Sequence, residues 1–201
     1  MEKNLIPIGL GSGSITQYSI SEVVDQKNIE EYLIKNINII EKYINKQDDR
    51  YAQEILSNLK NNNSLNFLIN KHLEIFIKKN WEDPIKIIKY IIFRFKFLEC
   101  GKKKINIGYP PYLLIEPVST CNLRCPFCFQ TDKSFTKKPF MGVMKMDLFK
   151  KVVDEANRLG VGAITLASRG EPTLHKNFIE MLDYLGEKKN IFEIKINTNG
   201  S

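Results

Sequence analysis

The sequence predicts an α/β fold with parallel strands over residues 109–201, preceded by an all-α region and by a flexible leader. Three short apolar runs, at residues 111–118, 162–167 and 191–196, are typical of buried strands. The segments between these runs are each long enough for a crossover helix, and a β-α-β-α-β order implies parallel strands with right-handed connections. Further towards the N-terminus, apolar residues recur at helical spacing instead.

The first part of the chain divides into two predicted segments. Residues 1–20 are predicted to be a flexible leader, because their glycines follow no strand and do not form a dinucleotide-binding turn. Residues 21–108 are predicted to be helical. The candidate N-caps of four helices are Ser21, Asp48 or Asp49, Ser64, and Asp83, which precedes Pro84. The fourth helix mixes apolar and basic residues, so it is either a core helix with basic side chains reaching solvent or a helix on a membrane surface.

Two helices are predicted between the three strands. Asp147 is the predicted N-cap of the first, and Gly160 is its predicted C-terminal stop. The second follows His175, for which we predict a packing or surface role, and ends near Gly186. Residues 129–146 precede the first helix, carry lysines and phenylalanines, and are predicted to form a long loop over the mouth of a site.

The composition is that of a globular protein, with 43% hydrophobic and 26% charged residues. The net charge of +7 is spread evenly: residues 1–108 hold 17 basic and 13 acidic residues, and residues 109–201 hold 13 and 10. A nucleic-acid-binding surface would concentrate positive charge, so no nucleic-acid partner is indicated. No signal peptide opens the chain and no apolar run could span a bilayer, so we expect a cytoplasmic location.

Three of the four cysteines, Cys121, Cys125 and Cys128, lie within eight residues at C-x3-C-x2-C spacing. They follow the first predicted strand, so they occupy a loop at its carboxyl end, where α/β folds bind ligands. Three thiolates leave a tetrahedral metal or an iron–sulfur cubane one ligand short, and that position is open to another group. Cys100, 21 residues upstream, is predicted to be an ordinary thiol at a helix end.

This pattern resembles the radical S-adenosylmethionine (SAM) superfamily, in which C-x3-C-x2-C follows the first barrel strand. Phe127 stands where an aromatic residue is common in that family. The stretch Ser168-Arg169-Gly170-Glu171-Pro172 is similar to the family's Gly-Glu-Pro motif after the second strand, although Arg169 stands where many members have glycine. Thr-Asn-Gly at 198–200 also matches. The resemblance covers residues 109–201 and implies the N-terminal half of a radical SAM partial (β/α) barrel.

The resemblance implies that Cys121, Cys125 and Cys128 hold a [4Fe–4S] cluster and that SAM binds its open iron. The residues that it places around SAM are Arg124, Phe127, Ser168, Gly170, Glu171 and Pro172. The Glu171 carboxylate would accept from the methionyl ammonium. An electron donor such as flavodoxin or ferredoxin would reduce the cluster, and SAM would be cleaved to a 5′-deoxyadenosyl radical that abstracts hydrogen from an unknown substrate. No catalytic acid or base is assignable.

Two alternatives stay open. A non-catalytic module holding zinc or an electron-transfer iron–sulfur cluster would take Cys100 as a fourth ligand, but it leaves the Gly-Glu-Pro similarity unexplained. The other alternative is an inactive fragment, because the family's cores typically have six βα units and this sequence stops after the third predicted strand. For the same reason we expect the N-terminal part of an enzyme, with the third strand at a sheet edge.

Overall fold

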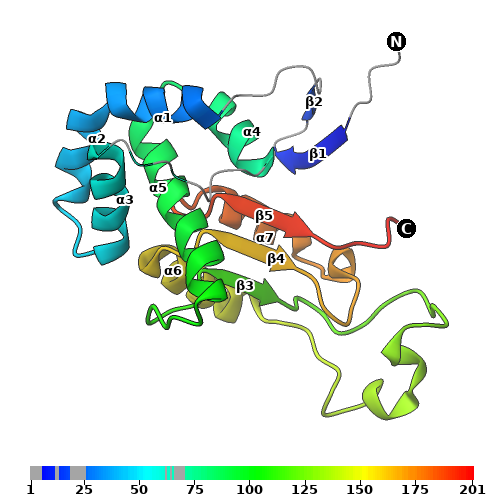
Figure 1. Ribbon diagram of the computed structural model, residues 1–201. Helices are drawn as coiled ribbons and strands as arrows, with labels where there is room; N and C mark the ends of the chain where they lie inside the picture. The colour runs from blue at the N-terminus through cyan, green and yellow to red at the C-terminus, as the bar shows by residue number, and fades with distance from the viewer. Residues whose placement is uncertain (1–5, 12–13, 19–25, 62, 64, 66–70) are drawn as a thin grey trace. The chain divides into compact units, whose positions relative to one another are not determined.

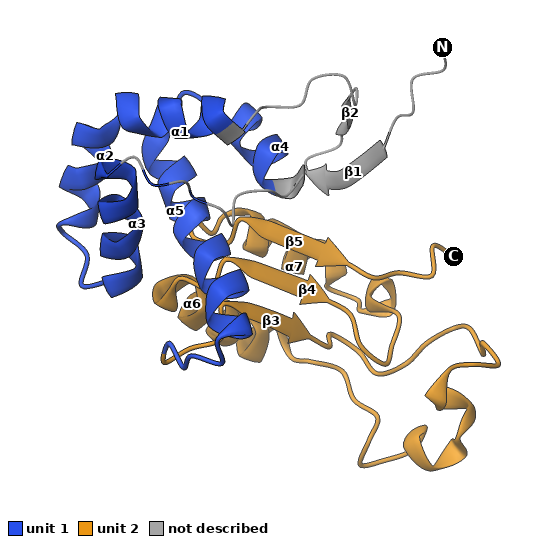
Figure 2. Ribbon diagram, viewed as in Figure 1, with its two compact units in different colours: residues 1–107 blue, residues 108–201 orange. Residues whose placement is uncertain are grey.

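The computed structural model describes residues 6–11, 14–18, 26–61, 63, 65 and 71–201. The chain divides into two compact units, residues 1–107 and residues 108–201, which Figure 2 colours separately. The division falls one residue from the boundary predicted from the sequence.

The first unit contains the helices α1 (Gln26–Lys35), α2 (Ile37–Ile44), α3 (Arg50–Lys60), α4 (Lys71–Lys79) and α5 (Pro84–Phe95), followed by the π-helix η1 (Lys96–Cys100). Two predicted caps are present. The Asp49 carboxylate accepts the backbone N–H groups of Tyr51 and Ala52 at 3.0 and 3.3 Å, and Asp83 accepts that of Lys86 at 2.9 Å. The other two candidate caps, Ser21 and Ser64, lie outside the described residues.

The first predicted helix is two helices, so the expectation of one continuous helix was wrong. The break lies at Asn36, whose side-chain amide donates to the carbonyl oxygen of Tyr32 at 2.9 Å. Asparagine competes with the backbone for hydrogen bonds in this way, which is why it interrupts helices.

The stretch predicted as a flexible leader contains two short strands. β1 (Ile6–Gly11) pairs antiparallel with β2 (Ser14–Tyr18). The rest of residues 1–20 lies outside the described part of the chain, so the flexibility of this segment stays a prediction.

The apolar and basic helix α5 is a core helix of the first unit. Ile87, Ile88 and Ile91 are fully buried, and Arg94 is also buried. This burial supports a core helix. The expectation that its basic side chains reach solvent holds for Lys86, which is exposed, and was wrong for Arg94. Among the described residues, no helix has the length and apolarity needed to cross a membrane.

The second unit is an α/β layer, as predicted. The strands β3 (Tyr112–Ile115), β4 (Ala163–Leu166) and β5 (Glu193–Ile196) are parallel, in the order β3-β4-β5. The connecting helices are α6 (Met146–Leu159) and α7 (Phe178–Gly186). Figure 1 shows the three arrows pointing the same way, with both helices behind the sheet. This is the arrangement that consecutive right-handed crossovers produce.

One hydrophobic core joins α6 and α7 to the sheet. It contains Ile115, Phe149, Val153, Ala156, Val161, Ile164, Leu166, Met181, Leu185 and Ile191. Phe149 and Met181 are fully buried between the two helices and the strands. The core therefore fixes the carboxyl ends of the three strands at one edge of the sheet.

The ends of α6 correct one prediction and confirm another. The helix begins at Met146 after the extended residue Lys145, so Asp147 lies in the first turn and is not the N-cap. A carboxylate in that turn is still favourable, because it faces the positive end of the helix dipole. Gly160 ends the helix in the left-handed conformation, at φ 85°, which glycine adopts without strain.

Candidate metal and cofactor site

The cysteine loop and the Gly-Glu-Pro stretch meet where β3 and β4 end. The backbone N–H of Glu171 donates to the carbonyl oxygen of Thr120 at 2.9 Å, one residue before Cys121. The parallel register brings the carboxyl ends of the strands to one edge. Ser168, which precedes Arg169, is exposed and has a φ of 107°, a conformation that a serine holds only when the surrounding structure imposes it.

Gly170 lies against the backbone that leads into the cysteine loop. A Cβ at this position would lie 1.9 Å from the carbonyl oxygen of Val118 and 2.8 Å from that of Thr120. Both neighbours are backbone atoms, so no side chain can rotate away to make room. The backbone of residues 118–120, which leads into the cysteine loop, therefore packs directly on the backbone of Gly170, which follows β4.

The residue that departs from the family pattern, Arg169, forms an ion pair with Glu116 after β3. The guanidinium donates from Nε and from Nη2 to the two carboxylate oxygens, at 2.9 and 2.6 Å. The backbone N–H of Arg169 and the hydroxyl of Ser119 also donate to this carboxylate, at 3.0 and 2.7 Å. A bidentate pair with two further donors is a strong, directional contact. It ties the ends of β3 and β4 together.

The same contacts shift the titration of Glu116. Burial raises the pKa of this carboxyl, but the hydrogen bonds from Arg169 and Ser119 outweigh burial and lower the pKa from 4.5 to about 2. The folded state therefore keeps Glu116 ionised at a pH at which the unfolded chain has protonated it.

We expect this ion pair to make the stability of the protein acid-sensitive in a defined window. Because the folded-state pKa is depressed, the stabilisation is fully present above about pH 4.5 and is lost as the pH falls through about 2. At about 1.4 kcal/mol for each pKa unit, the fall in pKa sets an upper bound of about 3.5 kcal/mol, and solvent screening of this partly exposed pair reduces the actual value. Thermal unfolding of the wild type and of Glu116→Gln should differ most near neutral pH and converge towards about pH 2. Parallel pH profiles for the two proteins would contradict this.

Glu171 is buried and its carboxylate is already engaged by protein donors. One oxygen accepts from the N–H and the hydroxyl of Thr173 at 3.1 and 2.8 Å and from the hydroxyl of Thr198 at 2.8 Å. The other oxygen accepts the backbone N–H of Asn199 at 2.7 Å. Burial raises the pKa of Glu171, but these hydrogen bonds outweigh burial and keep it below the usual value. Glu171 thus joins the ends of β4 and β5, and its predicted contact with a methionyl ammonium stays a prediction.

The three clustered cysteines are free thiols and are partly exposed. The loop turns between two of them, since the N–H of Cys128 donates to the carbonyl of Cys125 at 3.0 Å. Among the residues that the structure describes, no three Cys, His, Asp or Glu side chains converge on one point as metal ligands do. The donor set, three soft thiols on one loop, fits an iron–sulfur cluster with an open iron. The loop would have to close for the three sulfurs to share one centre.

The remaining loop residues predicted around SAM have different environments. Phe127 is 91% exposed. Arg124 is turned back onto its own loop, where one guanidinium nitrogen donates to the carbonyls of Cys121 and Leu123 at 2.7 and 2.8 Å. Pro172 is buried in the short 3-10 helix η4 (Pro172–Leu174). The structure therefore brings Gly170 and Glu171 against the backbone that leads into the cysteine loop and leaves the ring of Phe127 in solvent.

Residues 131–141, which we call the excursion, form a loop whose two flanking residues are both hydrogen-bonded to Ser119. Gln130 is buried, and its amide donates to the carbonyls of Ser119 at 2.9 Å and of Arg169. At the other end, the N–H of Ser119 donates to the carbonyl of Gly142 at 2.9 Å. The 3-10 helix η2 (Phe129–Thr131) leads into this segment, and η3 (Lys133–Phe135) lies within it. The segment extends past the arrowheads of the sheet in Figure 1. Closure over a site mouth stays a prediction.

His175 has the packing role predicted for it. It is buried, its Nε2 contacts the carbonyl oxygen of Met144 at 2.8 Å, and its Nδ1 accepts the N–H of Asn177 at 3.1 Å. Both ring nitrogens are engaged, so His175 holds the approach to α6 against the connection after β4.

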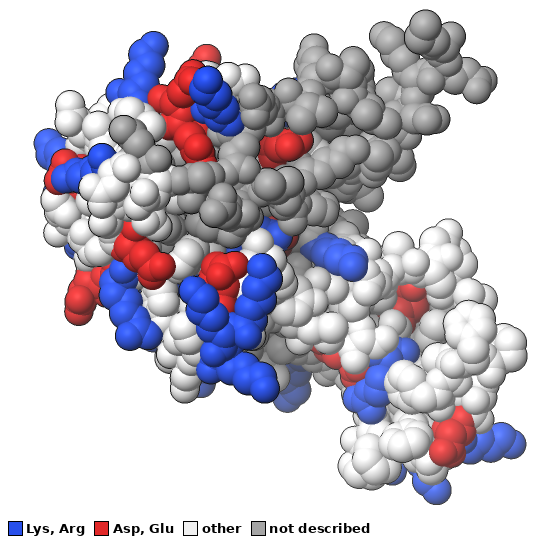
Figure 3. Space-filling view, viewed as in Figure 1, with Lys and Arg blue, Asp and Glu red and all other residues white. Residues whose placement is uncertain are grey.

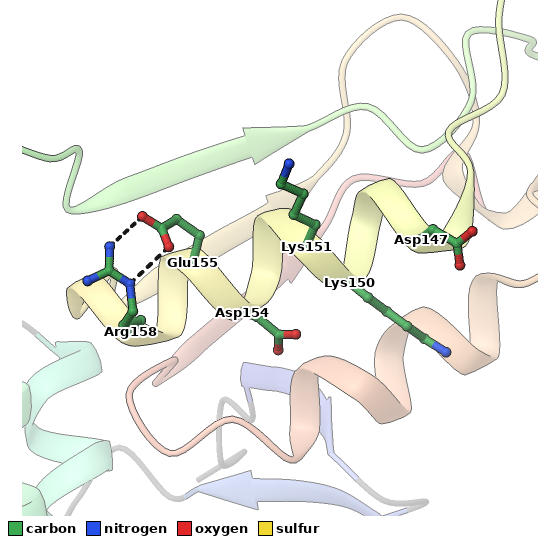
Figure 4. Close-up of a pocket in the computed structure, with 6 residues that line it drawn as sticks. All are labelled: Asp147, Lys150, Lys151, Asp154, Glu155 and Arg158. Carbon is green, nitrogen blue, oxygen red and sulfur yellow. Dashed lines mark hydrogen bonds and ion pairs between the residues drawn. The ribbon is translucent and has the colours of Figure 1, made fainter.

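The hollow drawn in Figure 4, of about 610 Å³, is a second concave surface. All six of its lining residues belong to α6: Asp147, Lys150, Lys151, Asp154, Glu155 and Arg158. Several of these charges are paired: Lys150 with Glu180, and Asp154 with Lys188 on the segment after α7. The hollow contains none of the predicted site residues. Basic and acidic side chains are interspersed on the face shown in Figure 3.

Three residues with contacts at this site were given no role from the sequence: Glu116, Gln130 and Asn199. Asn199 follows the third predicted strand, and Glu116 lies near the carboxyl end of the first predicted run, 111–118. A position at the carboxyl end of a strand is the signal that could have found both residues. Gln130 carries no comparable signal, because its burial depends on the path of the excursion.

Comparison with known proteins relates the second unit to one family. The model of the radical SAM superfamily matches residues 115–201. A tungsten-containing aldehyde ferredoxin oxidoreductase cofactor-modifying protein of Pyrococcus furiosus is 37% identical over 91 residues, 45% of this chain and 24% of the relative. GTP 3',8-cyclases of Ectopseudomonas mendocina and Desulforamulus reducens are 32% and 30% identical over 90 and 89 residues, covering 45% and 44% of this chain and 26% and 27% of the relatives. No solved structure matches. The chain spans about a quarter of the length of these curated relatives.

Proposed function

Since residues 115–201 belong to the radical SAM superfamily, we propose that this chain is the cluster- and SAM-binding part of a radical SAM enzyme. The observation that carries the proposal is the contact between the two motifs. Three free thiols follow directly on Thr120, whose carbonyl accepts the N–H of Glu171. Three thiols that could hold a cluster therefore lie beside the polar backbone that follows β4. An amino acid bound to the cluster would need such polar groups next to it.

In this proposal Cys121, Cys125 and Cys128 hold a [4Fe–4S] cluster with one open iron. When bound, the cluster supplies the electron that cleaves SAM to methionine and a 5′-deoxyadenosyl radical, which abstracts hydrogen from a substrate. Gly170 lets the second strand's exit lie against the cysteine loop, and Glu171 orders that exit through Thr173 and Asn199. The exposed Phe127 ring is available to cover the bound ligand.

The four-ligand alternative has less support in the structure. Cys100 is 4% exposed and lies on η1 in the first unit, whereas the three clustered thiols are partly exposed in the second. A buried thiol at a helix end acts as a small apolar side chain. A zinc or electron-transfer module would also leave the contact between Glu171 and the cysteine loop without a role.

The substrate is left open in this proposal. The names of the relatives describe whole proteins of which the shared segment is about a quarter, so the segment itself accounts for the common first step and not for the final reaction. We propose a one-electron donor such as flavodoxin or ferredoxin as a partner, and a reducing, cytoplasmic compartment that keeps the thiols free.

SAM binding is expected to depend on the cluster and to be opposed by methionine. In this proposal the site binds the amino and carboxylate groups of SAM, and methionine has the same two groups. Calorimetric titration of the anaerobically reconstituted protein with SAM, with and without excess methionine, measures this. After reduction, 5′-deoxyadenosine should appear in the wild type and be absent without iron. SAM binding that is equal with and without the cluster, or unaffected by methionine, would contradict the proposal.

A further inference from the structure

Asn199, at the exit of β5, reaches across the site to the cysteine loop. Its side-chain amide nitrogen lies 3.7 Å from the sulfur of Cys121 and 2.9 Å from the side-chain oxygen of Asn122. These three residues come from the exits of the first and third strands of the sheet, 77 and 78 positions apart in the sequence. Among the hydrogen bonds of the described residues, Cys121 is the only one of the three clustered cysteines whose sulfur accepts from a residue at another strand's exit.

The orientation of the Asn199 amide follows from its other contacts. The side-chain oxygen accepts both the N–H and the hydroxyl of Ser201, at 3.0 and 2.8 Å. The oxygen must therefore face Ser201, and the NH₂ group must face Cys121 and Asn122. An amide has two N–H donors, and the two acceptors in reach are the Asn122 oxygen and the Cys121 sulfur.

The backbone of Asn199 is fixed as well. Its N–H donates to the Glu171 carboxylate at 2.7 Å, and Glu171 is 2% exposed. A hydrogen bond to a buried carboxylate is short and directional. The Gly-Glu-Pro stretch thereby determines where the amide that meets Cys121 is placed.

We propose that Asn199 is a positioning residue that donates an N–H to the Cys121 sulfur and raises the reduction potential of the cluster. This inference rests on the proposed function, since it requires the cluster. One-electron reduction adds negative charge that the ligating sulfurs share, and an N–H donor stabilises the charged form. Contacts of this kind around the ligands hold the ligands in place and tune the metal.

The test compares the wild type, Asn199→Ala and Asn199→Asp after anaerobic reconstitution. Redox titration followed by electron paramagnetic resonance gives the midpoint potential of each cluster. At a fixed solution potential, the ratio of reduced to oxidised cluster should fall about threefold to tenfold in Asn199→Ala, which equals about 30 to 60 mV for one electron. Asn199→Asp should shift the potential further in the same direction, because it replaces the donor by a negative charge.

Asn177→Ala is the matched control, since the Asn177 amide donates to Glu180 at 2.9 Å beside α7. Its midpoint potential should equal that of the wild type. An Asn199→Ala cluster with unchanged potential and full iron content would overturn the inference while leaving the proposed function intact. Failure of the wild type to take up iron would instead refute the proposed function.

A second measurement needs no cluster. In the metal-free protein, Asn199→Cys should form a disulfide with Cys121 on mild oxidation, detected by peptide mapping and mass spectrometry. Asn177→Cys should form none with the cysteine loop. Cross-linking of residue 199 to Cys125 or Cys128 in preference to Cys121, or no cross-link, would show that the amide does not lie beside the Cys121 sulfur.

Discussion

Replacing Cys125 by alanine is expected to abolish cluster binding. The wild type, reconstituted anaerobically with iron and sulfide, should hold about four irons per chain. Cys121, Cys125 and Cys128 lie on one loop and are the ligands proposed, so removing the middle one leaves two thiolates for a cluster that needs three from the protein. Colorimetric iron and sulfide assays together with the visible absorption of the cluster measure the loss.

Cys100→Ala is the control for this experiment. Cys100 is buried on η1 in the first unit, so its removal should leave the iron content unchanged. The substitution exchanges a small buried side chain for a slightly smaller one, and we expect a stability loss of about 1 kcal/mol. Loss of iron in Cys100→Ala would support the four-ligand module over the open-iron site.

Gly170→Ala is expected to have the second largest effect, on stability and on the site together. The new Cβ would lie 1.9 Å from the Val118 carbonyl oxygen, a distance that no contact in a folded protein tolerates. The obstacle is backbone, so either the exit of β4 or the lead into the cysteine loop must move. Overpacking by one methyl group typically costs about 1–3 kcal/mol, and a backbone clash of this depth should exceed that range. Chemical denaturation followed by circular dichroism, with iron content after reconstitution, measures both effects.

Gly186→Ala supplies the comparison at the end of α7. A Cβ there meets no heavy atom within 4 Å, and the residue is helical. We therefore expect no loss of stability and a gain of up to about 1 kcal/mol, because alanine favours helix and loses less entropy on folding. Equal stability of Gly170→Ala and the wild type would show that the two strand exits are not in contact.

The fold of the second unit was predictable because its signals are local. Apolar runs marked β3, β4 and β5, and Gly160 marked the end of α6 by a conformation that other residues avoid. The Asp83 cap was readable for the same reason, since cap and capped N–H lie three residues apart. The break at Asn36 was missed because helical periodicity continues on both sides of it.

The hydrogen bonds and the ion pair of the site were not predictable, because they join residues that are distant in the sequence. Glu116 and Arg169 are 53 residues apart, and Asn199 is 78 residues from Cys121. Strand order alone was enough to predict that the motifs lie at the carboxyl ends of the strands. Which side chains then meet depends on the turn geometry after each strand, such as the positive φ of Ser168.

The two residues that flank the excursion are hydrogen-bonded to Ser119, and this affects how the protein tolerates insertions in that segment. The Gln130 amide donates to the carbonyl of Ser119, and the N–H of Ser119 donates to the carbonyl of Gly142. The segment between Gln130 and Gly142 is therefore a loop with both ends held at one residue, and its length does not set the position of the cysteine loop. Doubling the length of such a loop costs only about 0.6 kcal/mol of closure entropy. Insertions between Asp132 and Met141 can thus reshape the surface next to the cysteine loop while that loop keeps its geometry.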